Sequence, residues 1–373
     1  MLIDTTLREG HQRFGLYMDL PSQQKIMEMS ACLGMEEIEA GVAGRDENLS
    51  SLISFSRALS AKPRISIWSP LRVESISAAQ NLGPDIINIG VPVSDLHLKN
   101  RLGISREKLL KRLTDVMRQF QKASALISIG LEDISRADHE FALEVARTFA
   151  DSGGWRVRLS DSVGLLSPRE VLGVVEKFRH NLEVKLAFHS HNDLGMATGN
   201  SVSALDAGCD FVDVSVLGIG ERSGIARLEE VMTWLVLKKN KGYSLRVLPD
   251  LCAYVAGLAG ISIDNHRPVI GSEIFNVETG LHVDGIYKNP ELFEPFDPAR
   301  VGHKRFISLG GKSGQSAVKA KISQLLLNSR EYNIEELTCR VRATAMATGH
   351  PISDRTFLKI AQEQKPEHEG LSE

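Results

Sequence analysis

The stretch AFHSHNDLG, residues 187–195, follows an apolar run that begins at Val184. The run 184–188 predicts a buried strand, because short apolar segments between polar turns are typical of strands inside a sheet. Side chains two residues apart on a strand leave from the same face, so His189 and His191 converge. Two neutral imidazoles on one face can bind a metal ion together, although an isolated His-x-His pair more often marks a solvated strand end. The metal interpretation therefore depends on a further ligand elsewhere in the chain.

Short apolar runs alternate with amphipathic, helix-like segments throughout the first 240 residues. Eight strands, each followed by a helical pattern, fit a (β/α)8 TIM barrel of about 240 residues. A doubly wound parallel sheet is the alternative, because alternating strands and helices alone do not distinguish the two folds. The expected strands are residues 2–4, 37–41, 64–68, 86–90, 126–130, 156–159, 184–188 and 211–216.

Polar and chemically reactive residues follow most of the predicted strands. In a barrel the carboxyl ends of the strands meet at one rim, where barrel enzymes hold their active sites. The gathering of such residues at one rim favours a catalytic site over a set of unrelated solvated loops. The segments are DTTLREGHQ (4–12), EAG (39–41), GLED (130–133), SDS (160–162), HSHND (189–193) and GIGERSG (218–224).

The overall composition is ordinary for a globular protein, with 42% hydrophobic and 24% charged residues among 373. A formal net charge of −3 does not favour nucleic-acid binding, which needs a clustered basic face. We expect no signal peptide and no membrane span, because no apolar run is long enough for one. The scattered cysteines form no CxxC pair, which indicates reduced thiols in a cytoplasmic protein.

The barrel pattern stops near the segment KKNKG, residues 238–242. We therefore expect a catalytic barrel over residues 1–240, followed by a lid and a small helical region over residues 241–373. The second part contains ETGLHVDG (278–285), a proline-rich loop (289–298) and the glycine-rich GGKSG (310–314), with helical patterns after them.

Four motifs, in this order, resemble a family of metal-dependent barrels, the DRE-TIM metallolyases. That family includes 2-isopropylmalate, citramalate and homocitrate synthases, with hydroxymethylglutaryl-CoA lyase as a relative. The motifs are DTTLREGHQ (4–12), HSHNDLG (189–195), GIGERSG (218–224) and ETGLHVDG (278–285). The segments most similar to homocitrate synthases, the nitrogenase-associated type above all, are GLEDISRADHEF (130–141), RLSDSVGLLSP (158–168) and NDLGMATGNSVSALDAG (192–208).

Several positions depart from the common family pattern. Most members have aspartate at the position of Glu9 and asparagine at that of Ile225, and the lysine-pathway homocitrate synthases resemble this chain at both. Glu9, one methylene longer, would reach a metal differently, with an apolar neighbour in place of an amide ligand. His11 stands where the synthases usually have glutamate, and Arg305 where several have a tyrosine.

The resemblance implies one divalent metal ion, Zn, Mn, Mg or Co, bound by Glu9, His189 and His191. It also implies that Arg8, which is always charged, stabilises the negative charge that develops on a keto oxygen.

Further roles follow from the same resemblance. His282 is the candidate general acid or base, and Glu132 is a second catalytic candidate. Arg136 and His97 are candidates for a distal carboxylate, although Arg136 could equally form an ion pair at a helix start. The residues expected to contact the substrate are Gln12, Glu39, His97, Arg136 and Ser162.

The reaction implied is a Claisen condensation of acetyl-CoA with 2-oxoglutarate and water, which gives homocitrate and CoA. Three alternatives remain open: a sister synthase (2-isopropylmalate, citramalate or phosphonomethylmalate synthase), a C–C lyase on the same metal, and a non-catalytic binding protein. His11 favours the lyase, whereas the ETGLHVDG segment disfavours it. The resemblance also implies a homodimer whose partners are acetyl-CoA and a small 2-oxo acid, with no nucleic acid and no membrane.

Overall fold

The computed structural model describes residues 1–364. The chain divides into two compact units, the first covering Met1–Ile263 and the second beginning at Asp264. The sequence placed the division after residue 240, whereas the first unit extends to Ile263 and so includes one more helix, α10 (Leu248–Ala259). Among the residues described, no helix combines the length and the apolarity needed to cross a membrane.

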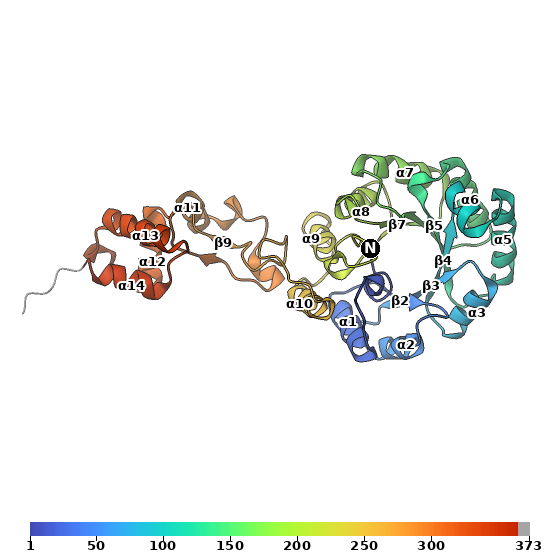
Figure 1. Cartoon of the computed structure of the whole chain (residues 1–373), viewed down its shortest axis with the longest axis horizontal. Coiled ribbons are helices and arrows are strands. Elements are labelled where there is room, and N and C mark those ends of the chain that lie inside the picture. Colours follow the sequence, from blue (N-terminus) through green and yellow to red (C-terminus); the bar gives the residue numbers. More distant parts are fainter. Residues whose placement is uncertain (365–373) are drawn as a thin grey trace, which may run out of the picture. The chain divides into compact units, whose positions relative to one another are not determined.

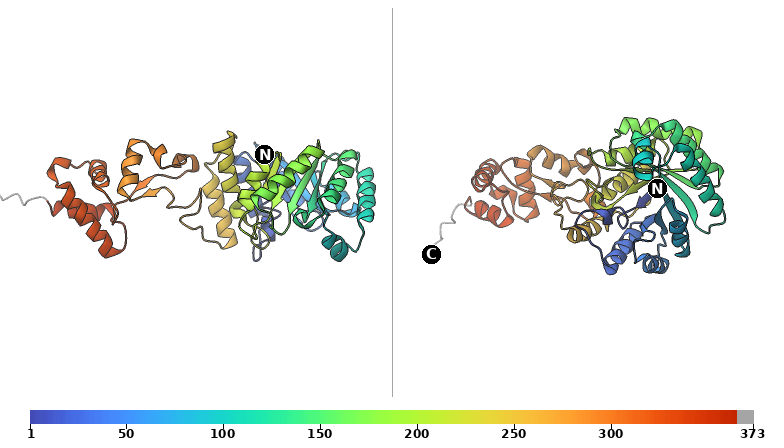
Figure 2. Two further views of the ribbon diagram at one scale, coloured as in Figure 1. Left: turned by 90° about the horizontal axis from the view of Figure 1, so that it is seen from above. Right: turned by 45° about the vertical axis from the view of Figure 1, so that its right-hand side comes forward.

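The first unit is a closed barrel of eight parallel strands, paired in the order β1 to β8. Because β8 also pairs with β1, with Leu2 opposite Val212, the TIM barrel is confirmed and the doubly wound sheet is excluded. The strands form an inner ring and the helices an outer one (Figure 1, Figure 2). The strands are β1 (Leu2–Asp4), β2 (Glu37–Val42), β3 (Arg64–Pro70), β4 (Ile86–Pro92), β5 (Leu126–Glu132), β6 (Arg156–Asp161), β7 (Lys185–Ser190) and β8 (Phe211–Val214).

Helices alternate with the strands, as the amphipathic segments predicted. The start of α7 shows how the sequence sets such a boundary. Ser167 and Glu170 form a reciprocal capping box, in which the Ser167 N–H donates to Glu170 Oε2 at 2.8 Å, and Pro168 occupies the first helical position. The helices around the barrel are α1 (Leu20–Cys32), α2 (Leu49–Ala58), α3 (Val73–Asn81), α4 (Asp95–His97), α5 (Arg106–Gln119), α6 (His139–Asp151), α7 (Pro168–Asn181), α8 (Ala197–Asp206) and α9 (Leu228–Lys239).

Strands β2 to β7 end one or two residues later than the sequence predicted, and β8 ends two residues earlier, at Val214. Glu132 and His189 therefore lie within strands rather than in the loops that follow them. The reason is that their polar side chains find partners inside the barrel, so the apolar pattern stops before the backbone pairing does. Ser160 of β6, for example, still pairs with His189 of β7.

The interior of this barrel is polar, although barrel interiors are usually filled by branched apolar side chains. Alternate strand positions such as Ile129 and Leu159 are fully buried and apolar, and they face the surrounding helices. On the inner face Arg156 of β6 reaches across to Glu37 of β2, with Nη1 2.6 Å from Oε2. Both side chains are almost completely buried, and such charges require matched partners because an unpaired buried charge costs several kcal/mol.

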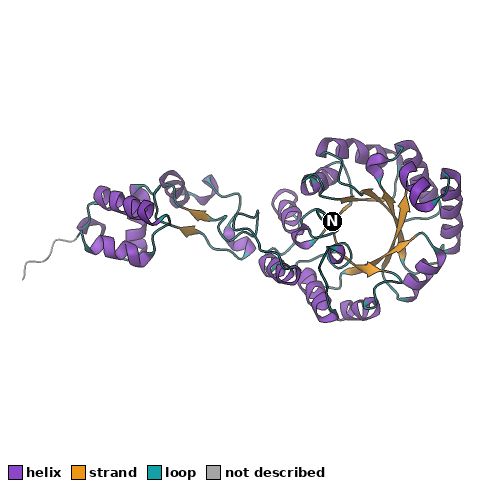
Figure 3. Ribbon diagram, in the orientation of Figure 1, coloured by secondary structure: helices purple, strands orange, loops and turns teal. Residues whose placement is uncertain are grey.

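The second unit contains a two-stranded parallel sheet and a group of helices (Figure 3), which confirms the predicted C-terminal helical region. Its core consists of buried apolar side chains that include Val283, Val318, Leu337 and Phe357. The action of part of this unit as a lid stays a prediction. The elements are β9 (Asn276–Val277), α11 (Gly280–Lys288), β10 (Phe306–Ile307), α12 (Gln315–Gln324), α13 (Ile334–Thr348) and α14 (Asp354–Gln362).

Candidate active site

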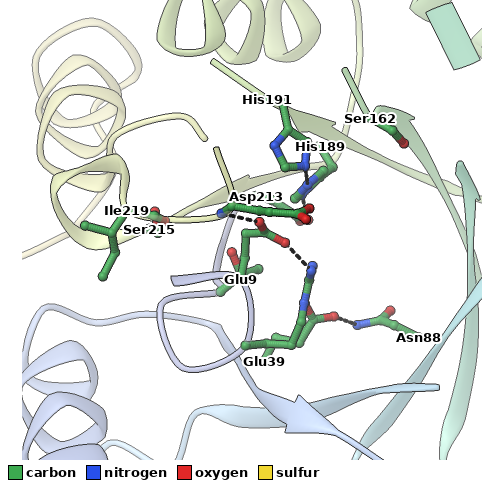
Figure 4. Close-up of polar contacts among 12 residues, drawn as sticks. Glu9, Glu39, Asn88, Ser162, His189, His191, Asp213, Ser215 and Ile219 are labelled. Atoms are coloured by element: carbon green, nitrogen blue, oxygen red, sulfur yellow. Dashed lines mark hydrogen bonds and ion pairs between the residues drawn. The ribbon is translucent and has the colours of Figure 1, made fainter. Parts of the chain in front are cut away.

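The three side chains expected to bind a metal lie together in the barrel. Glu9 follows β1, His189 is in β7, and His191 comes directly after that strand. Their ligand atoms all lie within 4.8 Å of one another, and the two imidazole Nε2 atoms are 3.2 Å apart. All three side chains are buried and converge on one point (Figure 4). The folded chain thus places side by side the two histidines and the carboxylate that its sequence keeps far apart.

The surroundings of the two histidines suit a divalent cation. Asp213 Oδ2 accepts a hydrogen bond from His189 Nδ1 at 2.8 Å, which leaves the lone pair of this imidazole on Nε2. Burial, together with the neighbouring His189, lowers the pKa of His191 to about 3, so the imidazole of His191 is neutral. Within residues 1–364 no partner is found for the buried Nδ1 of His191. Two imidazole nitrogens and one carboxylate oxygen form a mixed donor set suited to a divalent ion such as Zn²⁺.

The charges around this group are unequal. Glu9, Glu39 and Asp213 are buried carboxylates, whereas Arg8 and Arg158 are the guanidinium groups that pair with them. Burial would raise the pKa of Glu9, but Arg8 and the two histidines lower it. Burial also opposes ionisation of Glu39, yet Arg158 and Arg8 lower the pKa of its carboxyl to about 2. One negative charge is therefore left in excess, and a bound cation would balance it.

Arg8 is fixed between two carboxylates. Its Nη1 donates to Glu9 Oε2 at 2.5 Å, and its Nε donates to Glu39 Oε2 at 2.6 Å. The other oxygen of Glu39 accepts hydrogen bonds from Asn88 Nδ2 at 2.7 Å and Arg158 Nη1 at 3.1 Å. Glu39 is fully buried and is not part of the cavity wall, so it lies behind Arg8 with both oxygens occupied.

The GIGERSG loop, residues 218–224, approaches Glu9 closely. The backbone N–H of Glu221 donates to Glu9 Oε1 at 3.1 Å. Gly224 has a φ of +79°, and a Cβ there would lie 1.8 Å from a carbonyl oxygen of the same loop, so the turn requires glycine. The next residue, Ile225, is buried and pairs through its backbone with His191.

A cavity of about 360 Å³ is formed by these groups, within the size range of small-molecule sites. Most of the residues that the sequence predicted for the site contribute to its wall, whereas Glu39, Arg136 and His282, the last of which belongs to the second unit, are not among the lining residues. The predicted residues that line it are Arg8, Glu9, Gln12, His97, Glu132, Ser162, His189 and His191.

Arg136 forms the helix-start ion pair that the sequence left open as its alternative role. Its Nε donates to Asp133 Oδ1 at 2.8 Å. Asp133 is fully buried, has an unusual φ of +65°, and accepts a hydrogen bond from Ser94 Oγ at 2.5 Å. Its backbone N–H donates to Ser162 Oγ at 2.9 Å, and its Oδ2 lies 3.8 Å from His97 Nε2. Asp133, for which the sequence predicted no role, thus contacts three of the residues expected to bind the substrate, Arg136, Ser162 and His97.

Several other residues of the cavity wall were also missed. Arg101, in the short helical turn Leu98–Leu102 after β4, pairs with Glu132, with Nη1 2.6 Å from Oε2. Arg158 had a signal in the sequence, because Arg156 and Arg158 alternate within a predicted strand and must share one face. Arg222 lies in the GIGERSG motif, although no role was predicted for it, and no local pattern distinguishes Trp68 or Arg101. The missed residues are Trp68, Arg101, Arg158 and Arg222.

The second unit holds His282, near the start of α11. Its side chain is exposed, its Nδ1 lies within hydrogen-bond distance of Thr279 Oγ1 at 2.9 Å, and its ring packs on Phe293 with centroids 4.3 Å apart. In the same unit Arg305, the residue that replaces a family tyrosine, pairs with Glu294 at 2.6 Å.

Gly90 of β4 lies where the cavity wall is most crowded. A Cβ at this position would be 2.3 Å from Glu132 Oε1 and 2.5 Å from Trp68 Cζ2. We expect Gly90→Ala to lower the free energy of unfolding, measured by urea denaturation, by about 1–3 kcal/mol, the usual cost of overpacking. The control is Gly173→Ala in α7, where no atom lies within 4 Å of the added Cβ. Alanine inside a helix should instead stabilise the protein by about 0.5–1 kcal/mol. A Gly90→Ala protein as stable as its parent would mean that the wall rearranges without cost.

Family models match nearly the whole chain. A model described as HMGL-like matches residues 1–255. A second, described as homocitrate synthase post-HMGL domain-like, matches residues 269–348.

Individual proteins show the same likeness. The 2-isopropylmalate synthase 2 of Caldanaerobacter subterraneus subsp. tengcongensis is 31% identical over 366 residues, which cover 97% of this chain and 95% of that protein. Homocitrate synthase AksA of Methanopyrus kandleri is 32% identical over 347 residues, which cover 92% of this chain and 87% of that protein. The crystal structure of an HMG-CoA lyase from Brucella melitensis shares the fold, with a TM-score of 0.62 and 17% identity over 69% of this chain and 98% of that one. The two synthases are about equally similar, so identity alone does not choose between their reactions.

Proposed function

Because the chain belongs to the HMGL-like family, we propose that it is an acyltransferase that condenses acetyl-CoA with a 2-oxo acid. We propose further that the acceptor is 2-oxoglutarate and that the product is homocitrate. The observation that carries the proposal is the buried group of Glu9, His189 and His191 beside Arg8. The names of the matched relatives, an isopropylmalate synthase and a homocitrate synthase, support the reaction class.

The condensation needs an electrophilic ketone, an enolate of the acetyl group and stabilisation of the alkoxide that forms. A divalent ion bound by Glu9, His189 and His191 would supply Lewis acidity toward the keto group. The Arg8 guanidinium is fixed beside this site, and it can donate a hydrogen bond to the oxygen on which negative charge develops. Such a preorganised donor acts mainly in the transition state, because the charge is greatest there.

Proton transfer at the acetyl methyl is assigned to His282, on the basis of the family resemblance. The contact between its Nδ1 and Thr279 Oγ1 fixes one ring nitrogen and leaves Nε2 available for the reaction. Glu132, on the cavity wall, is the second candidate for acid or base catalysis.

The distal carboxylate of 2-oxoglutarate requires a cationic partner, because a buried unpaired charge is costly. The cavity wall offers Arg101 and His97, which both follow β4, and Ser162 on the loop after β6. Arg101 has about half of its side chain exposed and is held by Glu132, so it is accessible and already directed toward the cavity. A branched aliphatic acceptor would instead place apolar groups against these polar side chains.

Release of the CoA thiol from acetyl-CoA, assayed with a panel of 2-oxo acids, tests the proposal directly. We expect 2-oxoglutarate to give a higher kcat/KM than 2-oxoisovalerate or pyruvate. If either of these is the better acceptor, the protein is a sister synthase and the homocitrate assignment is wrong. If no 2-oxo acid releases CoA, the condensation itself is wrong and C–C cleavage becomes the activity to assay.

Substitution of the two arginines near the cavity separates their roles. Arg101→Ala should raise the KM for 2-oxoglutarate about tenfold or more, since a hydrogen bond to a charged group contributes about 1.5–3 kcal/mol. The matched control is Arg136→Ala, because Arg136 pairs with Asp133 and is not part of the cavity wall. For a partly exposed pair of this kind we expect a change of less than about fivefold. Steady-state kinetics with 2-oxoglutarate would reverse the assignment if Arg136→Ala had the larger effect.

A further inference from the structure

Arg158 touches both of the carboxylates that support the site. Its side chain, on β6, is only 4% exposed. Nη1 donates to Glu39 Oε1 at 3.1 Å, and Nε lies 3.3 Å from Asp213 Oδ2. Glu39 in turn accepts a hydrogen bond from Arg8, and Asp213 accepts one from His189. Arg158 therefore links two carboxylates with different roles. Glu39 holds the proposed catalytic residue Arg8, and Asp213 holds the proposed metal ligand His189.

We infer that Arg158 is a positioning residue, which fixes Asp213 and Glu39 and through them sets the orientations of His189 and Arg8. Arg158 lines the cavity, but its contacts at the site are to Asp213 and Glu39 and not to the three expected metal ligands, so its effect on them is transmitted by the two carboxylates. This inference rests on the proposed metal-dependent function.

The first argument concerns Asp213. Its Oδ2 is shared by His189 Nδ1 at 2.8 Å and Arg158 Nε at 3.3 Å, while its buried Oδ1 has no hydrogen-bond partner in the part of the chain described. The carboxylate is thus held from two sides at one oxygen. Without Arg158 the carboxylate keeps only its hydrogen bond with the imidazole and can rotate, which loosens His189. Loss of such a partner of a metal-binding histidine typically lowers metal affinity 10–100-fold.

The second argument concerns Glu39. Its Oε1 is shared by Asn88 Nδ2 and Arg158 Nη1, and its Oε2 holds Arg8. Removal of Arg158 leaves the buried carboxylates of the site facing a single guanidinium. Arg8 must then neutralise more negative charge, so it is drawn away from the place where the substrate oxygen is expected. We expect a lower kcat with little change in the KM for the oxo acid.

Arg156 provides a matched control. It lies two residues earlier on β6, points to the same face, is fully buried and also pairs with a glutamate, Glu37, at 2.6 Å. It also donates hydrogen bonds to Asn88 and Ser128, and among the described residues it makes none to Asp213 or Glu39. A general effect of disturbing a buried arginine in this barrel would therefore be seen at both positions.

The experiment compares Arg158→Lys, Arg158→Met and Arg156→Lys in the full-length protein. Each protein is stripped with a chelator and titrated with Co²⁺, whose visible absorbance reports binding independently of turnover, and the thermal midpoint of each metal-free protein is recorded. Both Arg158 variants should bind Co²⁺ about tenfold or more weakly than the parent. Arg156→Lys should stay within about threefold of the parent, whatever its effect on the thermal midpoint.

Five outcomes are possible, and each one decides. The expected pattern supports a positioning role. Folded Arg158 variants with the affinity of the parent overturn it, and so does an equal loss in Arg156→Lys. Failure of the Arg158 variants to fold makes Arg158 a structural residue and also overturns the inference. A parent protein that binds no divalent ion at all refutes instead the proposed function, so the two failures are distinguishable.

Discussion

His189→Ala is expected to remove the bound divalent metal and to reduce CoA release to background. The imidazole is one of the three proposed protein ligands, and its removal also takes away the hydrogen-bond donor of the buried Asp213. Asp213 keeps its ion pair with Arg158 but no longer orients an imidazole, so the remaining proposed ligands, Glu9 and His191, lose both a partner and part of their fixed surroundings. Metal content after gel filtration and the rate of CoA release at saturating substrate are the measurements.

The control for this change is His180→Ala. His180 is exposed on α7, and its Nδ1 lies 2.8 Å from the Glu176 carbonyl oxygen. It is not among the residues that line the cavity. This variant should keep both its metal and its turnover. A His189→Ala protein that retained a full equivalent of metal would refute the metal site, and one that lost its metal but kept turnover would separate the metal from the reaction.

The barrel could be predicted from the sequence because the outward-facing strand positions carry a strong apolar signal. Ile87 and Ile89, for example, alternate within β4 and are buried against the outer helices. The closure of the sheet was less certain, because it rests on a contact between the ends of the unit, the pairing of β1 with β8. The ends of β5, β6 and β7 were predicted too early for a physical reason: these strands finish in polar residues, Glu132, Asp161 and Ser190, which interrupt the apolar pattern before the backbone pairing stops.

The metal group could be predicted because its histidines share one strand face and its carboxylate lies in a recognisable motif. The supporting residues could not be predicted in the same way. Whether Arg158 meets Glu39 and Asp213 depends on which strands face each other after the barrel closes, and no local pattern contains that information. Arg101 and Arg136 make the same point, since both follow strands and only the path of each loop decides which one lines the cavity.

Arg8→Lys is expected to lower kcat about a hundredfold or more, the usual result of losing one oxyanion-stabilising donor. The Arg8 guanidinium donates to Glu9 and Glu39 through separate nitrogens, Nη1 and Nε, which a single ammonium group cannot reproduce with the same geometry. The KM for the oxo acid should change much less, because the lost interaction is strongest when charge has developed on the substrate oxygen. Arg57→Lys is the control, since Arg57 forms a similar two-nitrogen pair with Asp85 on the outer surface of the barrel unit.

Metal content distinguishes the two ways in which Arg8→Lys could reduce the rate. Arg8 also holds Glu9, so a variant that loses its metal would show that the arginine acts by fixing that ligand. A variant that keeps its metal, binds the oxo acid with nearly the same KM and still turns over slowly would place the effect in the transition state. An unchanged kcat would remove Arg8 from the mechanism altogether. The ion pair with Glu39 would then be a purely structural contact, although it is buried and directly beside the cavity.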